Sequence, residues 1–300
     1  MKNRLVLGIF GWLLLFGASA LHAEDGFFDS NGVKLHYTTQ GHGDPVVLIH
    51  GFSVNSEFQW TLPGITKELA KDHQVICLDC RGHGRSGKPH DPKLYGNEMV
   101  EDVVRLLDHM KIGKAHVVGY SMGGFITLKL LATHPERLLS ATTGGAGWTR
   151  KIDTQFLNDL ADALQRGQGM EILLRRLAAR GQPPPAAEQL ESANRMMVLF
   201  NDPKALSAAM RALKNLAFPE QDLKANQVPA LALVGDRDPL KDGVDEMAAL
   251  MAHLQVVVIK GADHMNAFAR PEFIKSLHDF LNNHSAAQSA GHEVISVGSH

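Results

Sequence analysis

The sequence contains little cysteine and no excess of charge of either sign. Two cysteines among 300 residues cannot form a disulfide framework, and they lack the four-ligand spacing of a structural zinc site. Lysine and arginine (30 together) nearly balance aspartate and glutamate (32), which excludes the basic surface of a general nucleic-acid-binding protein. Hydrophobic residues make up 44 %, an ordinary value that excludes a disordered or fibrous chain. We therefore expect an ordinary packed core, with no metal and no cofactor.

The amino terminus carries a long uncharged segment. Two basic residues precede residues 5–23, whose apolar centre gives way to small residues. These three parts are typical of a secretory signal peptide, which we place at residues 1–23, with cleavage after Ala20 or Ala23. The interpretation predicts a bacterial protein that is periplasmic or secreted and is not stably inserted in a membrane. An uncleaved membrane anchor is the alternative, because 19 uncharged residues approach the ~20 that span a bilayer.

The chain beyond this segment alternates short apolar runs with segments of helical period. Residues 27–30 and 33–39 flank Asn31-Gly32, a strong hairpin signal, so we expect the domain to open with two antiparallel strands. Between most of the later runs lie helical patterns such as residues 97–110, with apolar positions three and four apart. This alternation predicts an α/β fold, with a mostly parallel eight-stranded sheet flanked by helices. The six later runs, each typical of a buried strand, are residues 46–50, 75–79, 115–120, 138–142, 230–235 and 254–259.

Residues 149–223 lack such runs and are expected to form a helical cap over the edge of the sheet. The α/β core then consists of two parts, residues 24–148 and 224–282, with the cap inserted between them. Residues 283–300 are rich in serine, alanine, glycine and histidine, and we predict a disordered tail there. The apolar positions expected to pack inside the cap lie on two helical faces, Ile152, Phe156, Leu160 and Leu164 on one and Leu206, Met210 and Leu213 on the other.

A serine stands between two glycines in Gly119-Tyr120-Ser121-Met122-Gly123, at a junction from strand to helix. A sharp turn there would project the hydroxyl of Ser121 toward a base, which a serine nucleophile needs. Side chains at positions 119 and 123 would collide with neighbouring backbone. The same turn places the amide of Met122 at a helix amino terminus, aimed at developing negative charge. In this context the motif predicts a nucleophile elbow.

A base and an orienting acid follow two later runs. His264 lies in a loop after the last apolar run, at the carboxyl edge of the sheet where Ser121 is also expected. Asp236 and Asp238 follow the preceding run, and the order Ser, Asp, His fits a catalytic triad on an α/β sheet. We choose Asp238 as the acid, with Asp236, which directly ends the strand, as the alternative. Asp263 adjoins His264 and is interpreted as a surface residue.

The chain resembles the α/β-hydrolase superfamily over about residues 27–281, in particular its lid-bearing branch of esterases, lactonases, C–C hydrolases and cofactor-free perhydrolases. The resemblance implies an oxyanion hole formed by the backbone amides of Phe52 and Met122, and it places the acid of the family on Asp238. It also implies that His50 shapes the oxyanion loop and that residues 79–86 form a structural turn without a catalytic role. The motifs that carry it are His50-Gly51-Phe52, Asp79-Cys80-Arg81-Gly82-His83-Gly84-Arg85-Ser86, the elbow at Ser121, Gly235-Asp236-Arg237-Asp238 and Gly261-Ala262-Asp263-His264.

A serine nucleophile points to acyl transfer. We expect a serine hydrolase, a carboxylesterase whose small-molecule partner is a small to medium, largely uncharged ester or lactone. A C–C bond hydrolase or a cofactor-free perhydrolase is the enzymatic alternative, and a ligand-binding receptor protein is the non-enzymatic one. Cys77 and Cys80 are expected to be buried thiols and no redox pair, because three residues along a strand span ~10 Å. Residues 196–200 are interpreted as packing within the cap, with an acyl pocket as the alternative.

Overall fold

Eight strands form one sheet in residues 23–183 and 185–286, the part of the chain that the structure, a computed structural model, describes. The strands are β1 (Glu24–Ser30), β2 (Val33–Gln40), β3 (Asp44–Ile49), β4 (His73–Leu78), β5 (Ala115–Tyr120), β6 (Leu138–Gly144), β7 (Ala230–Gly235) and β8 (Leu254–Ile259). Their order across the sheet is β1-β2-β4-β3-β5-β6-β7-β8. β1 and β2 form the predicted antiparallel hairpin at Asn31-Gly32, and β2 also pairs antiparallel with β4. All the other neighbouring strands are parallel.

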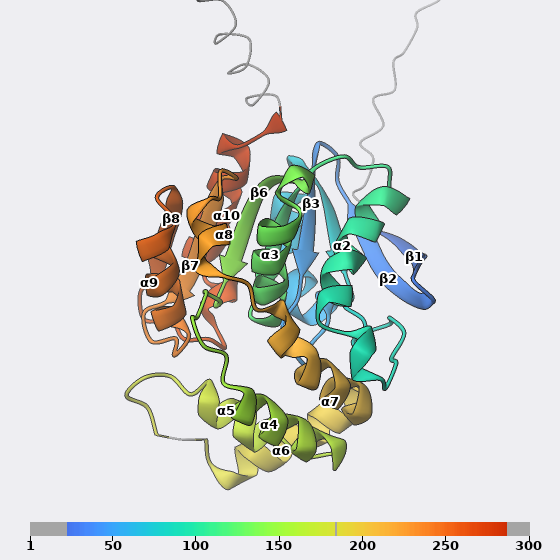
Figure 1. Ribbon diagram of the computed structural model, residues 1–300, viewed down its shortest axis with the longest axis vertical. Helices are drawn as coiled ribbons and strands as arrows, with labels where there is room; N and C mark the ends of the chain where they lie inside the picture. The colour runs from blue at the N-terminus through green and yellow to red at the C-terminus, as the bar shows by residue number, and fades with distance from the viewer. Residues whose placement is uncertain (1–22, 184, 287–300) are drawn as a thin grey trace, which may run out of the picture.

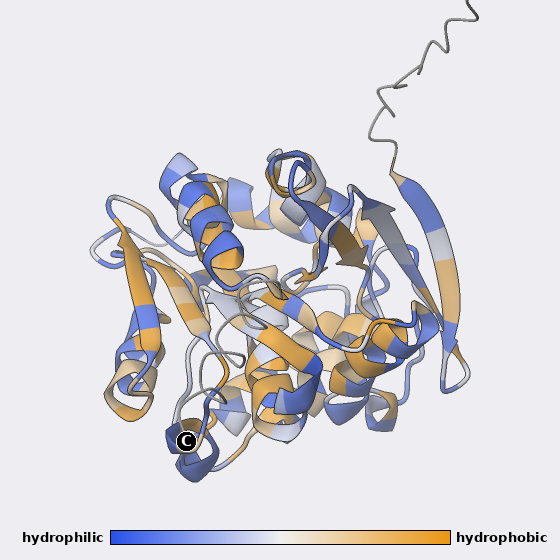
Figure 2. Cartoon of the chain, turned by 90° about the horizontal axis from the view of Figure 1, so that it is seen from above, coloured by the Kyte–Doolittle hydropathy of each residue, from blue (hydrophilic) through white to orange (hydrophobic). Residues whose placement is uncertain are grey.

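Helices cover both faces of this sheet. Successive side chains of a strand point to opposite faces, and here both faces carry apolar side chains that pack against helices. In β3, Val47 and Ile49 join one apolar cluster and Val46 and Leu48 join the other. The first cluster includes side chains of α2 (Asn97–His109), α3 (Met122–Thr133), α8 (Glu220–Lys224) and α9 (Lys241–Leu250). The second includes side chains of α1 (Ile65–Leu69) and α10 (Pro271–Asn283). Strands with hydrophobic residues therefore lie between two layers of helices, and the predicted α/β fold is confirmed (Figure 2).

The remaining helices form a layer at one end of the molecule, beside α3 (Figure 1). They are α4 (Thr154–Gln165), α5 (Met170–Arg176), α6 (Ala187–Phe200) and α7 (Pro203–Ala212). Within residues 149–183 and 185–223 the chain contains helices and no strand. Leu160 and Leu164 of α4 share a buried apolar cluster with Leu206 and Met210 of α7. This layer, which we call the cap, thus has a small core of its own.

Short helical turns complete the described chain. They are the π-helical turn η1 (Glu57–Thr61) and the 3-10 turns η2 (Pro92–Leu94), η3 (Pro135–Arg137), η4 (Leu213–Leu216) and η5 (Ala267–Ala269). Residues 1–22 and 287–300 lie outside the described part, and with them nearly all of the predicted signal peptide and tail. Among the helices of the described part, none is long and apolar enough to cross a membrane.

One strand differs from its prediction. The apolar run at residues 254–259 forms β8, but β8 is the last strand of the sheet, and Val256 and Val258 are 37 % and 44 % exposed. The prediction of a buried strand is therefore wrong here. An apolar run alone does not distinguish an interior strand from an edge strand, because both need residues that favour extended backbone.

Candidate active site

Ser121 occupies a sharp turn between β5 and α3. Its backbone has φ 52° and ψ −114°, a conformation that residues with a side chain rarely adopt. A Cβ atom on Gly119 would lie 2.0 Å from the carbonyl oxygen of Gly123, and a Cβ atom on Gly123 would lie 2.1 Å from that of Ile49. Only glycine fits at either position, so the two glycines let the strand, the serine and the helix approach one another closely.

The turn brings Ser121 to the imidazole of His264. The Nε2 atom of His264 lies 3.0 Å from Ser121 Oγ, and its Nδ1 atom lies 2.9 Å from Asp238 Oδ2. Asp238 is fully buried and His264 is 4 % exposed, so these contacts are shielded from water. Asp238 follows β7, and its second carboxylate oxygen accepts a hydrogen bond from the amide of Leu240. Three residues far apart in the sequence thus form one line of hydrogen-bonding groups.

The two other candidate carboxylates do not join this line. Asp236, the alternative acid, directly follows β7, and its amide donates to the carbonyl of Ile259. Asp263 is half-buried, and its carboxylate accepts a hydrogen bond from the amide of Met265. Of the carboxylates expected near His264, the structure brings Asp238 alone into contact with the imidazole, among the described residues.

Two residues that the sequence did not single out hold this arrangement. The hydroxyl of Tyr120 donates a hydrogen bond of 2.7 Å to the carbonyl oxygen of His264, and burial raises the pKa of Tyr120 well above its usual value. Gly145, at φ 54°, is packed so tightly that a Cβ atom there would lie 3.1 Å from both Asp238 Oδ2 and His264 Nδ1. In the sequence, the role of Gly145 beside Asp238 and His264 is marked only by the pair Gly144-Gly145 at the end of β6.

The backbone amides of Phe52 and Met122 were expected to form an oxyanion hole. Neither amide donates a hydrogen bond to another described residue. Met122 is the first residue of α3, where helical amides lack an internal acceptor. The Gly51–Phe52 peptide adjoins Ser121, since a Cβ atom on Gly51 would lie 3.5 Å from Ser121 Cβ. Two unpaired donors therefore remain near Ser121.

His50 orients the Gly51–Phe52 peptide from the other side. Its Nε2 atom accepts a hydrogen bond of 3.0 Å from the amide of Cys80, so Nδ1 carries the proton. Nδ1 then donates to the carbonyl oxygen of Gly51, 2.7 Å away. Burial lowers the pKa of His50 and keeps the ring neutral, as this pattern requires. Among the described residues, both ring nitrogens of His50 are bonded to this loop and to Cys80, and no hydrogen bond links the ring to Ser121.

Asp79 ties the same loop to the residues after β4. Its carboxylate accepts hydrogen bonds from the amide and hydroxyl of Ser56 and from the amide of Arg85, and it lies 2.8 Å from His36 Nδ1. Burial opposes ionisation of Asp79, but hydrogen bonds from His36, Arg85 and Ser56 outweigh it and hold the pKa well below its usual range. Residues 79–86 are thus a structural turn that supports the loop carrying Phe52.

The described residues include few cysteines and no close cluster of metal-binding side chains. No group of three His, Cys, Asp or Glu side chains among them could hold a metal ion. Cys77 and Cys80 are free and buried, as predicted, and burial raises the pKa of Cys77 to about 11. Both thiols therefore stay protonated at neutral pH.

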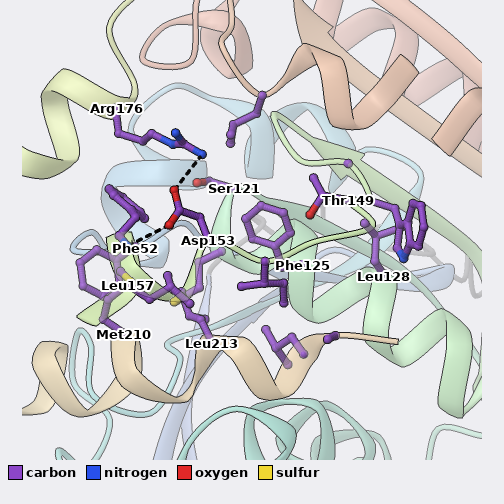
Figure 3. Close-up of a pocket in the computed structure, with 18 of the residues that line it drawn as sticks. Phe52, Ser121, Phe125, Leu128, Thr149, Asp153, Leu157, Arg176, Met210 and Leu213 are labelled. Atoms are coloured by element: carbon purple, nitrogen blue, oxygen red, sulfur yellow. Dashed lines mark hydrogen bonds and ion pairs between the residues drawn. The ribbon is translucent and has the colours of Figure 1, made fainter. Parts of the chain in front are cut away.

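Two cavities meet at Ser121. The first, of about 240 Å³, lies between α3 and the cap, and Figure 3 shows apolar side chains such as Phe125, Leu157 and Leu213 around it. The second, of about 410 Å³, lies between the loop after β3, α6 and the loop of His264. Ser121 lines both cavities, whereas His264 lines the second and not the first.

The cap residues 196–200 divide between two roles. Met197 is buried in the apolar cluster of the cap, as the favoured interpretation required. Met196 and Phe200 are each 50 % exposed and line the second cavity. The interpretation is therefore wrong for these two residues and for Val198 and Leu199, which are 49 % and 71 % exposed, while Met197 lines the second cavity as well as packing in the cap.

Comparison with known proteins agrees with this architecture. The sequence profile of the family described as alpha/beta hydrolase fold matches residues 44–271. The chain is 29 % identical over 254 residues to the dihydrolipoyllysine-residue acetyltransferase component of the acetoin cleaving system of Pseudomonas putida. That match covers 81 % of this chain but 64 % of the relative, less than two thirds of its length.

Two further similarities extend over most of both chains. The chain is 30 % identical over 247 residues to 3-oxoadipate enol-lactonase 2 of Acinetobacter baylyi, which covers 80 % of this chain and 90 % of the relative. A crystal structure from a study of carboxylesterases of Nitrososphaera gargenis superposes with a TM-score of 0.70 at 25 % identity, covering 86 % of this chain and 98 % of that one. The profile match alone spans well over half of the sequence. The chain therefore belongs to the α/β-hydrolase fold family.

Proposed function

We propose that the protein is a serine hydrolase that cleaves a small to medium, largely uncharged carboxylic ester or lactone. Ser121 is the nucleophile, His264 the base and Asp238 the acid that orients the imidazole. One observation carries the proposal. Ser121 Oγ, the His264 ring and Asp238 Oδ2 are linked by contacts of 3.0 and 2.9 Å beside two cavities. Membership in a hydrolase family supports it.

The reaction runs in two halves. As Ser121 Oγ bonds to the carbonyl carbon, its proton passes to His264 Nε2 and the carbonyl electron pair moves onto oxygen. The His264 proton then passes to the leaving oxygen while the bond between carbon and that oxygen breaks. Water repeats these steps on the acyl-enzyme and releases the acid. Asp238 holds Nδ1 protonated and stabilises the imidazolium.

The oxyanion formed in each half is assigned to the amides of Phe52 and Met122. Both are free of other described partners, and both belong to residues that line the first cavity. Donors that are already oriented in a dry site lower the barrier most, and losing one typically costs ~3 kcal/mol. The amide of Met122 adds the positive end of the α3 dipole.

Active-site labelling tests the assignment directly. A fluorophosphonate should modify Ser121 in the wild type, and Ser121→Ala should lose both the label and at least about a thousandfold in kcat on p-nitrophenyl butyrate. Ser192→Ala, which changes an exposed serine of α6, is the matched control and should keep both. Retention of a tenth of the activity by Ser121→Ala would refute the nucleophile.

The same assays separate the other candidate reactions. If a vinylogous diketone is turned over faster than any ester, the protein is a C–C bond hydrolase and not an esterase. Peroxide-dependent oxidation would indicate a perhydrolase. A chain that binds an ester without turnover and resists the fluorophosphonate would be a ligand-binding protein.

We also propose that residues 1–23 are an export signal, on the sequence pattern alone. The mass of the protein recovered from the periplasm or the medium tests this. A chain beginning near Leu21 or Glu24 is expected, and an intact Met1 would contradict it.

A further inference from the structure

The two cavities at Ser121 contain different parts of the machinery. Their common lining is Phe52, Ser121, Leu173 and Leu177. Met122 lines the first cavity and His264 lines the second. Because two leucines of the cap belong to both linings, they lie at the boundary between the cavities, above the nucleophile.

The position of His264 assigns one cavity to the leaving group. A general acid must lie within hydrogen-bonding reach of the atom that it protonates. The leaving oxygen must therefore be on the His264 side of Ser121, in the second cavity. The acyl group, bonded to the other side of the same carbon, then extends into the first cavity.

The first cavity suits an uncharged acyl group of limited length. Its volume, about 240 Å³, is smaller than that of the second cavity, about 410 Å³. Phe125, Leu128 and Leu157 supply apolar lining. Of its three charged lining residues, Asp153 lies 3.9 Å from the guanidinium of Arg176, and Lys151 is exposed to solvent (Figure 3).

The second cavity opens among exposed apolar side chains. Phe58, Met196, Phe200 and Met265 line it and are 46 %, 50 %, 50 % and 57 % exposed. The rings of Phe58 and Phe200 meet edge to face, with centroids 5.8 Å apart. Apolar side chains gathered at one mouth are a common mark of a binding surface. We call these four residues the apolar rim.

We propose, on the basis of the function proposed above, that the substrate is a neutral ester with a short to medium acyl group and a large apolar alcohol. The acyl group fills the first cavity, and the alcohol lies across the apolar rim. The occupant of the rim is the leaving group because the rim is continuous with the cavity that contains His264. A macromolecule on the rim would instead cover the route by which the alcohol leaves.

Two matched substitutions test the assignment of the cavities. Ala217 lines the first cavity and Ala193 the second, and neither is fully buried, so a tryptophan at either site is compatible with folding. Ala217→Trp should lower at least tenfold the ratio of kcat/KM for octanoate esters to that for acetate esters of the same small alcohol. Ala193→Trp should lower at least tenfold the ratio of kcat/KM for naphthyl acetate to that for methyl acetate. The opposite pattern would overturn the assignment.

The alcohol preference has its own test. Among acetate esters, kcat/KM of the wild type should rise at least tenfold from the methyl ester to the naphthyl or decyl ester. Met196→Ala, which shortens an exposed side chain of the apolar rim, should remove most of that rise, measured as the ratio of kcat/KM for naphthyl acetate to that for methyl acetate. A flat alcohol series would overturn the proposal. The proposal would also be overturned if binding of the protein to phosphatidylcholine vesicles depended on Met196 and the alcohol series did not depend on it.

Failure of this inference differs from failure of the proposed function. If Ser121 takes the fluorophosphonate and esters are hydrolysed, but the two tryptophan variants respond in the opposite sense, the function stands and the cavity assignment is wrong. If no ester is hydrolysed and Ser121 is not labelled, the function itself is wrong, and the inference falls with it.

Discussion

The Nδ1 atom of His50 lies 2.7 Å from the carbonyl oxygen of Gly51, and the proton that it donates fixes the plane of the peptide whose amide belongs to Phe52. In a trans peptide the carbonyl and the amide point in opposite directions. Holding the carbonyl of Gly51 therefore also holds the amide of Phe52, so His50 would control a proposed oxyanion donor from outside the cavities.

Two variants of His50 should separate this effect from a loss of stability. His50→Gln can still accept the Cys80 amide but does not reach the Gly51 carbonyl, whereas His50→Asn keeps a donor close to that carbonyl. We expect kcat of His50→Gln to fall about a hundredfold with KM within threefold, and that of His50→Asn to fall less. Steady-state kinetics measure this, with thermal unfolding of both variants as the control. Equal kcat values would contradict it.

Gly145→Ala should impair the site through contact as well as strain. The added methyl group would press on Asp238 and His264 at 3.1 Å, and φ 54° costs an alanine ~1–2 kcal/mol. Gly32→Ala, at φ 80° with nothing within 4 Å, carries similar strain without the contact. In urea, Gly145→Ala should lose at least as much stability as Gly32→Ala, and only Gly145→Ala should lose at least tenfold in kcat. Full activity of Gly145→Ala would disprove the role.

Asp238→Asn should lower kcat by about a thousandfold or more. The amide of the asparagine would donate to His264 Nδ1, which moves the ring proton to Nε2 and leaves no acceptor for the Ser121 proton. Asp236→Asn changes a carboxylate after the same strand that does not contact His264, and it should stay within threefold of the wild type. Initial rates on p-nitrophenyl butyrate distinguish the two. A larger loss in Asp236→Asn would move the acid to that residue.

The protein should lose stability in mild acid through His116. Burial lowers the pKa of this histidine to about 4, from an ordinary value near 6.5. The unfolded chain therefore binds the proton first, so the free energy of unfolding falls as the pH decreases from 6.5 toward 4. This one group contributes a loss of about 2 kcal/mol between pH 7 and 4.5.

Urea unfolding at pH 7 and 4.5 measures the effect. His116→Asn should reduce the difference in unfolding free energy between the two pH values by that amount, whatever its absolute stability. His253→Asn changes an exposed histidine and is the matched control, which should leave the difference unchanged. An unchanged difference in His116→Asn would mean that the buried ring does not titrate in this range.

Much of the fold was predictable because it depends on local pattern. The bounds of β5, β7 and β8 equal the apolar runs in the sequence, and Asn31-Gly32 marks the hairpin. The edge position of β8 was not predictable, because it depends on which strands pair. Such pairing involves residues far apart in the chain.

The candidate site was predictable to the same extent. The position of Ser121, His264 and two aspartates after predicted strands makes them candidates. Only the packing of the folded chain determines that Asp238, and not Asp236, contacts the imidazole. The support from Gly145 depends on the approach of separate segments, which no spacing reveals. The two cavities likewise combine loop, helix and cap residues that the sequence does not place together.

The backbone at Ser121 has a further consequence, for the relation between activity and stability. A conformation at φ 52° and ψ −114° costs a residue with a side chain ~1–3 kcal/mol, whereas glycine adopts it readily. Ser121→Gly should therefore unfold at higher temperature than Ser121→Ala, by about 1 kcal/mol in unfolding free energy, although both are inactive. Calorimetry of the pair measures this. The proposed nucleophile thus stands where stability alone would favour another residue, and the rest of the fold must compensate for keeping it there.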